Sequence, residues 1–318
     1  MKRIVRMATA LALGALLVQA VVGCGAPRTV AATQPTPAGF DPAKSDPKAV
    51  AIADEVMTAI GGEANWQKAH ELMWFQAIIV DGKIADASYH SWDRWNGRHD
   101  YKRVDPSGKL GVSMYDLFGQ SKGYALVEDA NGGHKSVAAD KEKMITEAKR
   151  RFDTDAYPLA LPFKLKDPGV HLKVSEERPA EGSKQGSPMK FDVLQVTFDD
   201  GVGTGAKDTW YLVVDKATHI PDSVEHVQAG KPDSERSGYT LEEWVEVGGL
   251  KFATVRKTLG YTKPDAPTVA VSVPKEWKDS VPPDLAGFKA QNPGEIVVVK
   301  GIKVNAEPSE EEYIPAVE

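Results

Sequence analysis

The sequence predicts a mainly β fold (α+β), in which about eleven strands form a curved antiparallel sheet, or unclosed β-barrel, with a helical lid. From Leu72 onward, apolar and polar residues alternate in short segments, and turn signals such as Asn96-Gly97 separate these segments. One helical pattern precedes the strands and one more interrupts them. Two helices leave little to fill the concave side of so large a sheet, so we expect a cavity there.

The folded body opens with a helix. Asp46 can cap this helix, Pro47 suits its first turn, and Gly61-Gly62 ends it. A short second helix is expected around residues 63–69.

Strands follow from the period of two. The predicted segments are 72–80, 84–95, 98–104, 110–118, 124–128, 171–174, 191–198, 209–214, 223–228, 239–247, 250–257 and 296–304. A two-residue loop at Asn96-Gly97 fixes the register of its hairpin. This register would place Trp92 opposite Tyr101.

A helix over Asp140 to Asp155 breaks the strand series. An apolar stripe of Met144, Ile145 and Phe152 lies on one face of this otherwise charged segment. The next residues, 157–163, are apolar but contain two prolines, so we expect a loop rather than a central strand. The helix is therefore the candidate lid.

Aromatic side chains are spread over the strands, where they either form an ordinary sheet core or line a cavity. The shortage of helices favours the cavity, which the helix and the apolar loop would close. This interpretation assigns the following residues to the cavity and its lid: Trp74, Trp92, Tyr101, Met144, Ile145, Phe152, Leu159, Leu161, Phe163, Trp210 and Trp244.

The first residues have the pattern of a secretion signal. Three cationic residues precede an uncharged run from Met7 to Val22, and Val21-Val22-Gly23-Cys24 ends the segment. The run is short for a membrane span, which needs about 20 apolar residues. A retained transmembrane helix and an ordinary cleaved signal with an incidental cysteine are the alternatives.

This ending resembles the lipobox of bacterial lipoproteins. The resemblance implies a signal peptide over residues 1–23, with palmitate or similar acyl chains on Cys24 as the membrane anchor. Cys24 is the only cysteine among the 318 residues, so the chain has no intramolecular disulfide. Gly25 follows it instead of Asp, and by resemblance to the sorting rule of two-membrane bacteria this predicts the outer membrane. We expect the protein to face the periplasm there, although the sequence itself does not decide the side.

The segment after the cysteine has too little apolar surface to fold. Residues 24–46 contain four prolines among small and polar residues, which predicts a disordered tether. One folded body then spans residues 47–318, and its proline-rich stretch 263–293 is expected to be an irregular insertion.

Several segments resemble, in the same order, parts of the bacterial outer-membrane lipoprotein-sorting (LolA/LolB-like) superfamily. They are residues 53–66, Trp92-Asp93-Arg94-Trp95, the string from Leu161 to Val170, residues 210–215 and Gly249-Leu250-Lys251. The resemblance covers most of residues 48–316. It implies an unclosed antiparallel β-barrel with a helical lid and an apolar cavity, which holds the acyl chains of lipoproteins in the sorting proteins. This chain departs from the soluble carrier in its lipobox, and from the smaller anchored receptor in residues 263–293.

No motif predicts catalysis, a metal or another cofactor. The seven histidines include no pair at metalloprotease spacing, and no G-x-S-x-G elbow occurs. His219 and His226 lie on neighbouring predicted strands near acidic residues, which leaves a metal site as a minor alternative. Removing residues 1–23 takes three positive charges and no negative ones from a formal net charge of -6, which leaves -9. An acidic chain is a poor partner for nucleic acid.

The leading hypothesis is a non-enzymatic, lipid-anchored periplasmic protein. It would bind an acyl chain or a lipoprotein in a cavity between the curved sheet and the helix at 140–155. The second hypothesis is an interaction scaffold, whose own side chains fill the interior and whose exposed strand edges recruit a partner. The third is a periplasmic hydrolase. The sequence indicates no particular protein partner.

Overall fold

The computed structural model describes residues 39–104, 110–116, 125–128, 134–136, 141–180, 184, 186–200, 202, 207–259, 267–292 and 294–306. Every pairing between its strands is antiparallel, and no sheet closes into a barrel. The largest sheet has nine strands in the order β12 (Glu242–Val247), β13 (Leu250–Lys257), β16 (Glu295–Val304), β1 (Glu71–Val80), β2 (Lys83–Asp93), β3 (Arg98–Val104), β4 (Leu110–Asp116), β5 (Ala125–Glu128) and β6 (His134–Ser136).

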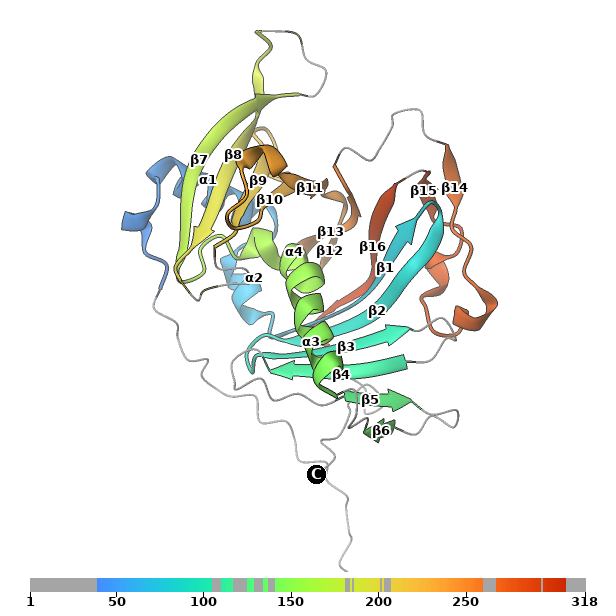
Figure 1. Cartoon of the computed structure of the whole chain (residues 1–318). Coiled ribbons are helices and arrows are strands. Elements are labelled where there is room, and N and C mark those ends of the chain that lie inside the picture. Colours follow the sequence, from blue (N-terminus) through green and yellow to red (C-terminus); the bar gives the residue numbers. More distant parts are fainter. Residues whose placement is uncertain are drawn as a thin grey trace, which may run out of the picture.

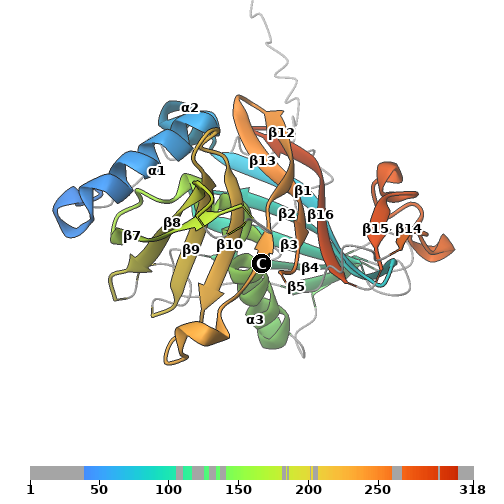
Figure 2. The ribbon, with the colours of Figure 1, turned by 90° about the horizontal axis from the view of Figure 1, so that it is seen from above.

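A second sheet has five strands and a third has two. The five-stranded sheet has the order β11 (Ser237–Thr240), β10 (Pro221–Val227), β9 (Thr209–Asp215), β8 (Met189–Phe198) and β7 (Val170–Pro179). The third pairs β14 (Thr268–Ala270) with β15 (Lys289–Gln291). Seen from above, the five-stranded sheet stands beside the large one, and the small sheet lies at the opposite end (Figure 2). The predicted fold class, a curved and unclosed antiparallel sheet with helices, is confirmed.

Helix α1 (Pro47–Ala59) begins where the sequence predicts. Oδ1 of Asp46 accepts a hydrogen bond from the amide of Lys48 over 2.9 Å, and Pro47 occupies the first turn. Gly61 ends the helix at a φ of +124°, and a Cβ there would lie 2.1 Å from the carbonyl oxygen of Gly249. This close approach holds α1 and the following α2 (Glu63–Lys68) against the hairpin of β12 and β13.

The last residues of the predicted tether belong to the folded body. Residues 42–44 form the short helix η1 (Pro42–Lys44), which Asp41 caps. The amide of Asp46 donates to the carbonyl oxygen of Leu172 over 2.8 Å, which attaches this segment to β7. Phe40 packs against the main apolar core. Residues 39–46 are thus ordered because the sheet offers them hydrogen bonds and apolar contacts.

The large sheet is covered on both faces, which strand β1 shows most clearly. Leu72 and Trp74 belong to the core that lies on the concave side, whereas Phe75 and Ala77 belong to a separate core. Residues 267–292 cover that second face with β14, β15 and the turns η5 (Lys275–Trp277) and η6 (Pro283–Leu285). The predicted insertion therefore contains regular elements and seals the convex side of the sheet.

The predicted register of the hairpin at Asn96-Gly97 is wrong. Trp92 pairs with His99, and Asp93 pairs with Arg98, so four residues form the turn instead of two. The carboxylate of Asp93 accepts hydrogen bonds from the backbone and side-chain nitrogens of Asn96 over 3.0 Å and 2.8 Å. This Asx-type contact stabilises the longer turn, because an Asp side chain can replace backbone hydrogen bonds there.

The predicted strand at 239–247 is two strands in different sheets. β11 belongs to the five-stranded sheet and β12 to the large one, and Leu241 lies buried between them. The amide of Leu241 donates to the carbonyl oxygen of Asp222 over 2.7 Å. At the other end, the amide of Leu259 donates to the carbonyl oxygen of Gly238 over 2.8 Å. The two sheets are joined at this corner.

The expected loop after the central helix is helical. Helix α3 (Lys141–Arg151) continues into the π-helical turn η2 (Phe152–Ala156), then α4 (Tyr157–Ala160) and the 3-10 turn η3 (Leu161–Phe163). Both prolines lie in the first turns of α4 and η3, where a proline needs no amide hydrogen. Residues 1–38, with Cys24, lie outside the described residues.

Candidate functional site

Helix α3 crosses the concave face of the large sheet, where it lies against β3, β4 and β5 (Figure 1). Only two of its eleven residues, Ala148 and Arg151, are buried. Met144 and Ile145, which the sequence assigns to the lid, are half-buried. Apolar burial therefore contributes little to holding this helix on the sheet, and polar contacts have to contribute more.

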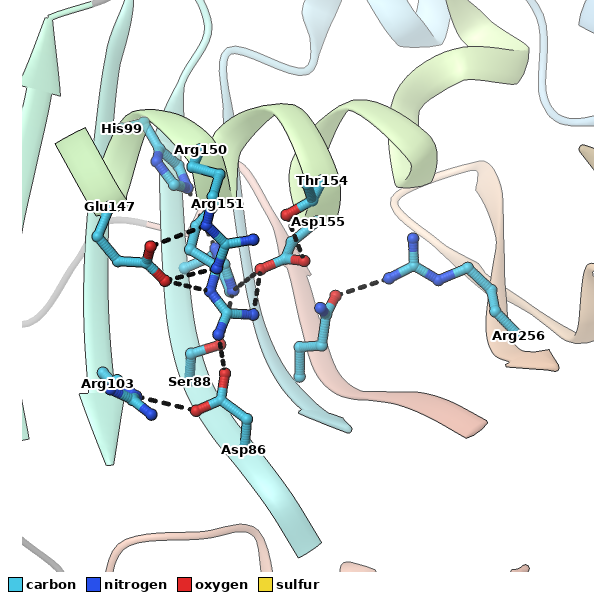
Figure 3. A network of polar contacts seen from close by, with 12 residues as sticks. Asp86, Ser88, His99, Arg103, Glu147, Arg150, Arg151, Thr154, Asp155 and Arg256 are labelled. Atoms are coloured by element: carbon cyan, nitrogen blue, oxygen red, sulfur yellow. Dashed lines mark hydrogen bonds and ion pairs between the residues drawn. The ribbon is translucent and has the colours of Figure 1, made fainter. Parts of the chain in front are cut away.

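A buried ion network joins α3 to the sheet (Figure 3). Arg151 pairs with Asp86 of β2, and its Nε and Nη1 atoms lie 2.9 Å and 3.3 Å from carboxylate oxygens of Glu147 and Asp155. Nε of Arg103 on β3 donates to Asp86 over 3.0 Å. Burial lowers the pKa of Arg151 while Asp155 and Asp86 raise it, and the net shift is upward. The guanidinium of Arg151 is thus charged and matched by three carboxylates.

Two fully buried histidines lie beneath this network. Nδ1 of His90 and Nε2 of His99 are 3.1 Å apart, and Oγ of Ser88 lies 2.9 Å from Nε2 of His90. The ring of Trp74 stacks on His90 with centroids 4.7 Å apart. Burial holds the pKa of both histidines well below the usual range, and Arg151 adds to this effect at His90. Both imidazoles are neutral at pH 7.

Most of the predicted cavity and lid residues lie together in one packed cluster. Trp92 meets Phe152 edge to face with centroids 5.1 Å apart, and Phe163 stacks on Trp66 at 4.5 Å. The following candidates are buried: Trp74, Trp92, Tyr101, Phe152, Leu159, Leu161, Phe163 and Trp210. All of these except Tyr101 belong to the main apolar core, and the ring of Tyr101 lies 5.4 Å from that of His90. An apolar cavity between sheet and helix stays a prediction.

Two candidates come from other parts of the fold. Trp210 on β9 lies in the five-stranded sheet, with its ring centroid 5.8 Å from that of Tyr157 and 4.5 Å from that of His226. Trp244 on β12 is half-buried, and its Nε1 donates to the carbonyl oxygen of Leu241 over 3.2 Å. Both contact the main core, but neither lies on the strands that α3 crosses.

Several buried polar atoms near the concave face have no hydrogen-bond partner among the described residues. They are Trp74 Nε1, Trp92 Nε1, His99 Nδ1, Tyr101 OH, Tyr239 OH and Arg256 Nε. An unpaired buried polar group costs about 1–3 kcal/mol, so such groups are rare in folded proteins. An additional polar group placed beside these atoms would therefore be stabilised.

Among known proteins, the chain is similar to several solved structures. No family model matches it, and no curated protein does. A solved LolA superfamily protein from Nitrosomonas europaea is 9% identical, with 82% of this chain and 94% of that one covered and a TM-score of 0.42. A putative outer membrane lipoprotein-sorting protein domain from Vibrio parahaemolyticus is 10% identical, with 83% and 95% covered and a TM-score of 0.41. A Pseudomonas aeruginosa MucA/MucB complex is 11% identical, with 78% and 92% covered and a TM-score of 0.18.

Solved LolA superfamily proteins are thus among those that this chain resembles. The sequence resemblance predicted such neighbours.

The structure also places the histidines that the sequence left open as metal ligands. His219 lies 3.2 Å from a carboxylate oxygen of Glu55, and His226 lies 2.8 Å from one of Asp208. In the part of the chain that the structure describes, no group of three His, Cys, Asp or Glu side chains is arranged to hold a metal ion. Within the same ranges, no helix is long and apolar enough to cross a membrane.

Sequence reasoning missed the polar half of the site. Asp86, Ser88 and His90 share the strand face of Trp92, and Gln76 shares that of Trp74. Alternation along the strands could have placed these side chains on the concave face, because residues two apart point the same way. No such signal marks Arg151, whose burial follows from the way α3 docks on the sheet.

Proposed function

We propose that this protein is a non-enzymatic, lipid-anchored component of the cell envelope that binds an acyl chain, free or attached to a larger molecule, on the concave face beneath α3. The observation that carries the proposal is the contrast between α3 and what it covers. The helix buries two residues of its own, while Tyr101 of β3 lies against Arg151 and Trp92 of β2 packs on Phe152, the residue that follows the helix. Moving α3 aside would expose an aromatic surface that an acyl chain could cover.

The energetics are compatible with such an exchange. Burial of apolar surface stabilises by roughly 25 cal/mol per Å², so an acyl chain can replace the contacts that the aromatic surface loses to α3. The ion pairs of Arg151 would open toward solvent, where charged groups are hydrated. The π-helical turn η2 follows α3 directly and supplies an irregular joint, a feature frequent at functional sites.

Uptake of a fluorescent fatty acid tests this proposal, using residues 24–318 with Cys24→Ser so that no attached lipid interferes. We expect saturable uptake, and a co-purifying lipid in native mass spectra. Ile145→Asp places a charge on the half-buried face of α3 and should abolish uptake, whereas Thr146→Asp changes an exposed neighbour and should leave it intact. Equal uptake by both variants would exclude α3 as the lid.

A second candidate function is an interaction scaffold. The observation that favours it is the packed cluster of Trp66, Trp92, Phe152 and Phe163, which fills the concave side with the chain's own side chains. Strand β12 forms one edge of the large sheet, so a partner could add a strand there. A lipid-free mass with no fatty-acid uptake would favour the scaffold.

The membrane anchor is tested separately. Acylation of Cys24 would place the protein in the membrane fraction and add the mass of the acyl chains to the mature N-terminal peptide. Cys24→Ser should release the protein into the soluble fraction. Retention of that variant in the membrane would show that another segment provides the attachment.

A further inference from the structure

Arg256 on β13 is a buried guanidinium without a carboxylate. Its exposed fraction is 4%, and Nη2 donates to Oε1 of Gln76 over 2.7 Å. Among the described residues, Arg256 takes part in no ion pair, and its Nε has no hydrogen-bond partner. Arg151 is buried to a similar degree and pairs with three carboxylates. Within the part of the chain that the structure describes, no carboxylate therefore lies within ion-pair distance of the charge of Arg256.

A second buried donor lies beside it. Cζ of Arg256 lies 5.5 Å from the ring centroid of Tyr239 on β11. The hydroxyl of Tyr239 lies close enough to this guanidinium for Arg256 to act on its pKa, but it makes no hydrogen bond of good geometry with any described residue. Burial raises the pKa of Tyr239 to about 12, so the phenol keeps its proton and can donate a hydrogen bond. Figure 3 shows Arg256 reaching from the right-hand strand toward its hydrogen-bond partner, an amide side chain that lies between Arg256 and Asp155 of η2.

The chemistry of these groups is selective for an anion. A buried charge is costly unless an opposite charge lies close to it. The planar guanidinium matches a carboxylate or a phosphate, both of which accept several hydrogen bonds at once. A neighbouring phenol hydroxyl would donate one more. A neutral head such as an alcohol or an ester would leave the guanidinium uncompensated.

Arg256 also lies close to the proposed binding site for the acyl chain. An anionic head group bound by Arg256 could therefore belong to the same ligand as that chain. Gln76, the hydrogen-bond partner of Arg256, and Trp74 lie on the same face of β1. Trp74 stacks on His90, and a carboxylate oxygen of Asp155, in the turn that follows α3, lies 3.9 Å from Nε2 of His90. Alternate residues of a strand are separated by about 6.6 Å, so a head at Arg256 stands at the border of the aromatic surface.

We propose that Arg256 and Tyr239 bind the anionic head, a carboxylate or a phosphate, of a ligand whose acyl chain lies beneath α3. The inference rests on the proposed function and narrows it. It favours a free fatty acid or an acylated phosphate over the lipid of a fully acylated lipoprotein cysteine, which carries no charge.

Binding of matched single-chain ligands at pH 8 tests the inference in residues 24–318 with Cys24→Ser. We expect dodecanoate and dodecyl phosphate to bind at least about tenfold more tightly than dodecanol. Arg256→Met should remove this preference and leave dodecanol binding unchanged. Tyr239→Phe should weaken the preference for the anionic ligands severalfold. Lys257→Met removes the neighbouring charge of β13, which pairs with Glu242, and should preserve the preference.

The outcomes separate the two proposals. Equal affinity of the wild-type protein for dodecanoate and dodecanol would overturn the anionic head and leave the acyl site standing. Absence of binding by all three ligands would overturn the acyl site itself. Acetate or inorganic phosphate binding as tightly as dodecanoate would show a site for small anions, which contradicts the lipid head. A preference that survives Arg256→Met would place the anion elsewhere.

Discussion

Two arginines on the same side of the large sheet have opposite surroundings. Arg151 comes from α3 and meets three carboxylates, whereas Arg256 comes from β13 and hydrogen-bonds to the amide of Gln76. Their exposed fractions are 7% and 4%, so burial does not distinguish them. A fully matched buried charge fixes one element against another. A buried charge without its counterion destabilises the fold. Its presence is therefore expected to serve something other than stability.

The largest expected effect is the loss of Arg151. Arg151→Met leaves Asp86 and Asp155 buried with fewer partners, and breaking a buried ion pair from one side costs about 3–5 kcal/mol. The free energy of unfolding, measured in urea at pH 7, should fall by that order. A loss below about 1 kcal/mol, the size typical of exposed ion pairs, would contradict the idea that this network attaches α3.

Because His90 and His99 are buried and neutral, we expect the free energy of unfolding to decrease in acid. In the unfolded chain, His90 and His99 take up protons near pH 6.5, while burial keeps both neutral in the folded protein well below that pH. The unfolded state then binds more protons, so stability is constant above about pH 7 and falls below about 6.5, by at most about 2.7 kcal/mol per pH unit for two sites.

Unfolding free energies between pH 5 and 8 check this dependence. The groups that face His90 are Asp155, with an oxygen 3.9 Å from Nε2, and the guanidiniums of Arg151 and Arg256. His99→Gln should roughly halve the slope, since one of the two titrating sites is removed. An unchanged slope in this variant would assign the acid sensitivity to other groups.

Replacing the unmatched arginine together with its partner should have the opposite sign. Arg256→Met combined with Gln76→Leu exchanges a buried polar pair for apolar side chains of similar volume. Such exchanges are neutral or stabilise by about 1–4 kcal/mol. Thermal unfolding of the ligand-free protein should therefore occur at the same or a higher temperature. A destabilised double variant would mean that Arg256 serves the fold, and the comparison with Arg151 would lose its basis.

The sequence predicted the positions of the strands well and the connections between them poorly. Alternation and turn signals located the boundaries of β3 and β13, which coincide with the predicted segments 98–104 and 250–257. The turn at Asn96-Gly97 was mispredicted because Asp93 adds its own side-chain hydrogen bonds. The break at Leu241 was missed because alternation continues through a residue where the chain changes sheet.

The aromatic part of the candidate site was predictable, and the charged part was not. Trp74 and Trp92 stand at inward positions of strands that any apolar pattern identifies. Arg256 shares the strand face of Phe252, so alternation alone places it inward, yet charged residues in strands are usually solvated. Whether such a residue is matched by a counterion depends on contacts between strands distant in sequence, such as β13 and β1.

The smallest expected change in the free energy of unfolding concerns Arg103, which contacts the same network from strand β3. Arg103 also pairs with Asp86. The exposed fraction of its side chain is 51%, whereas that of the Arg151 side chain alone is 9%. Because solvent screens an exposed ion pair, Arg103→Met should cost less than about 1 kcal/mol in the urea experiment used for Arg151. If both variants lose the same amount, Asp86 is held by the sheet as much as by the helix, and α3 is attached by something other than its buried arginine.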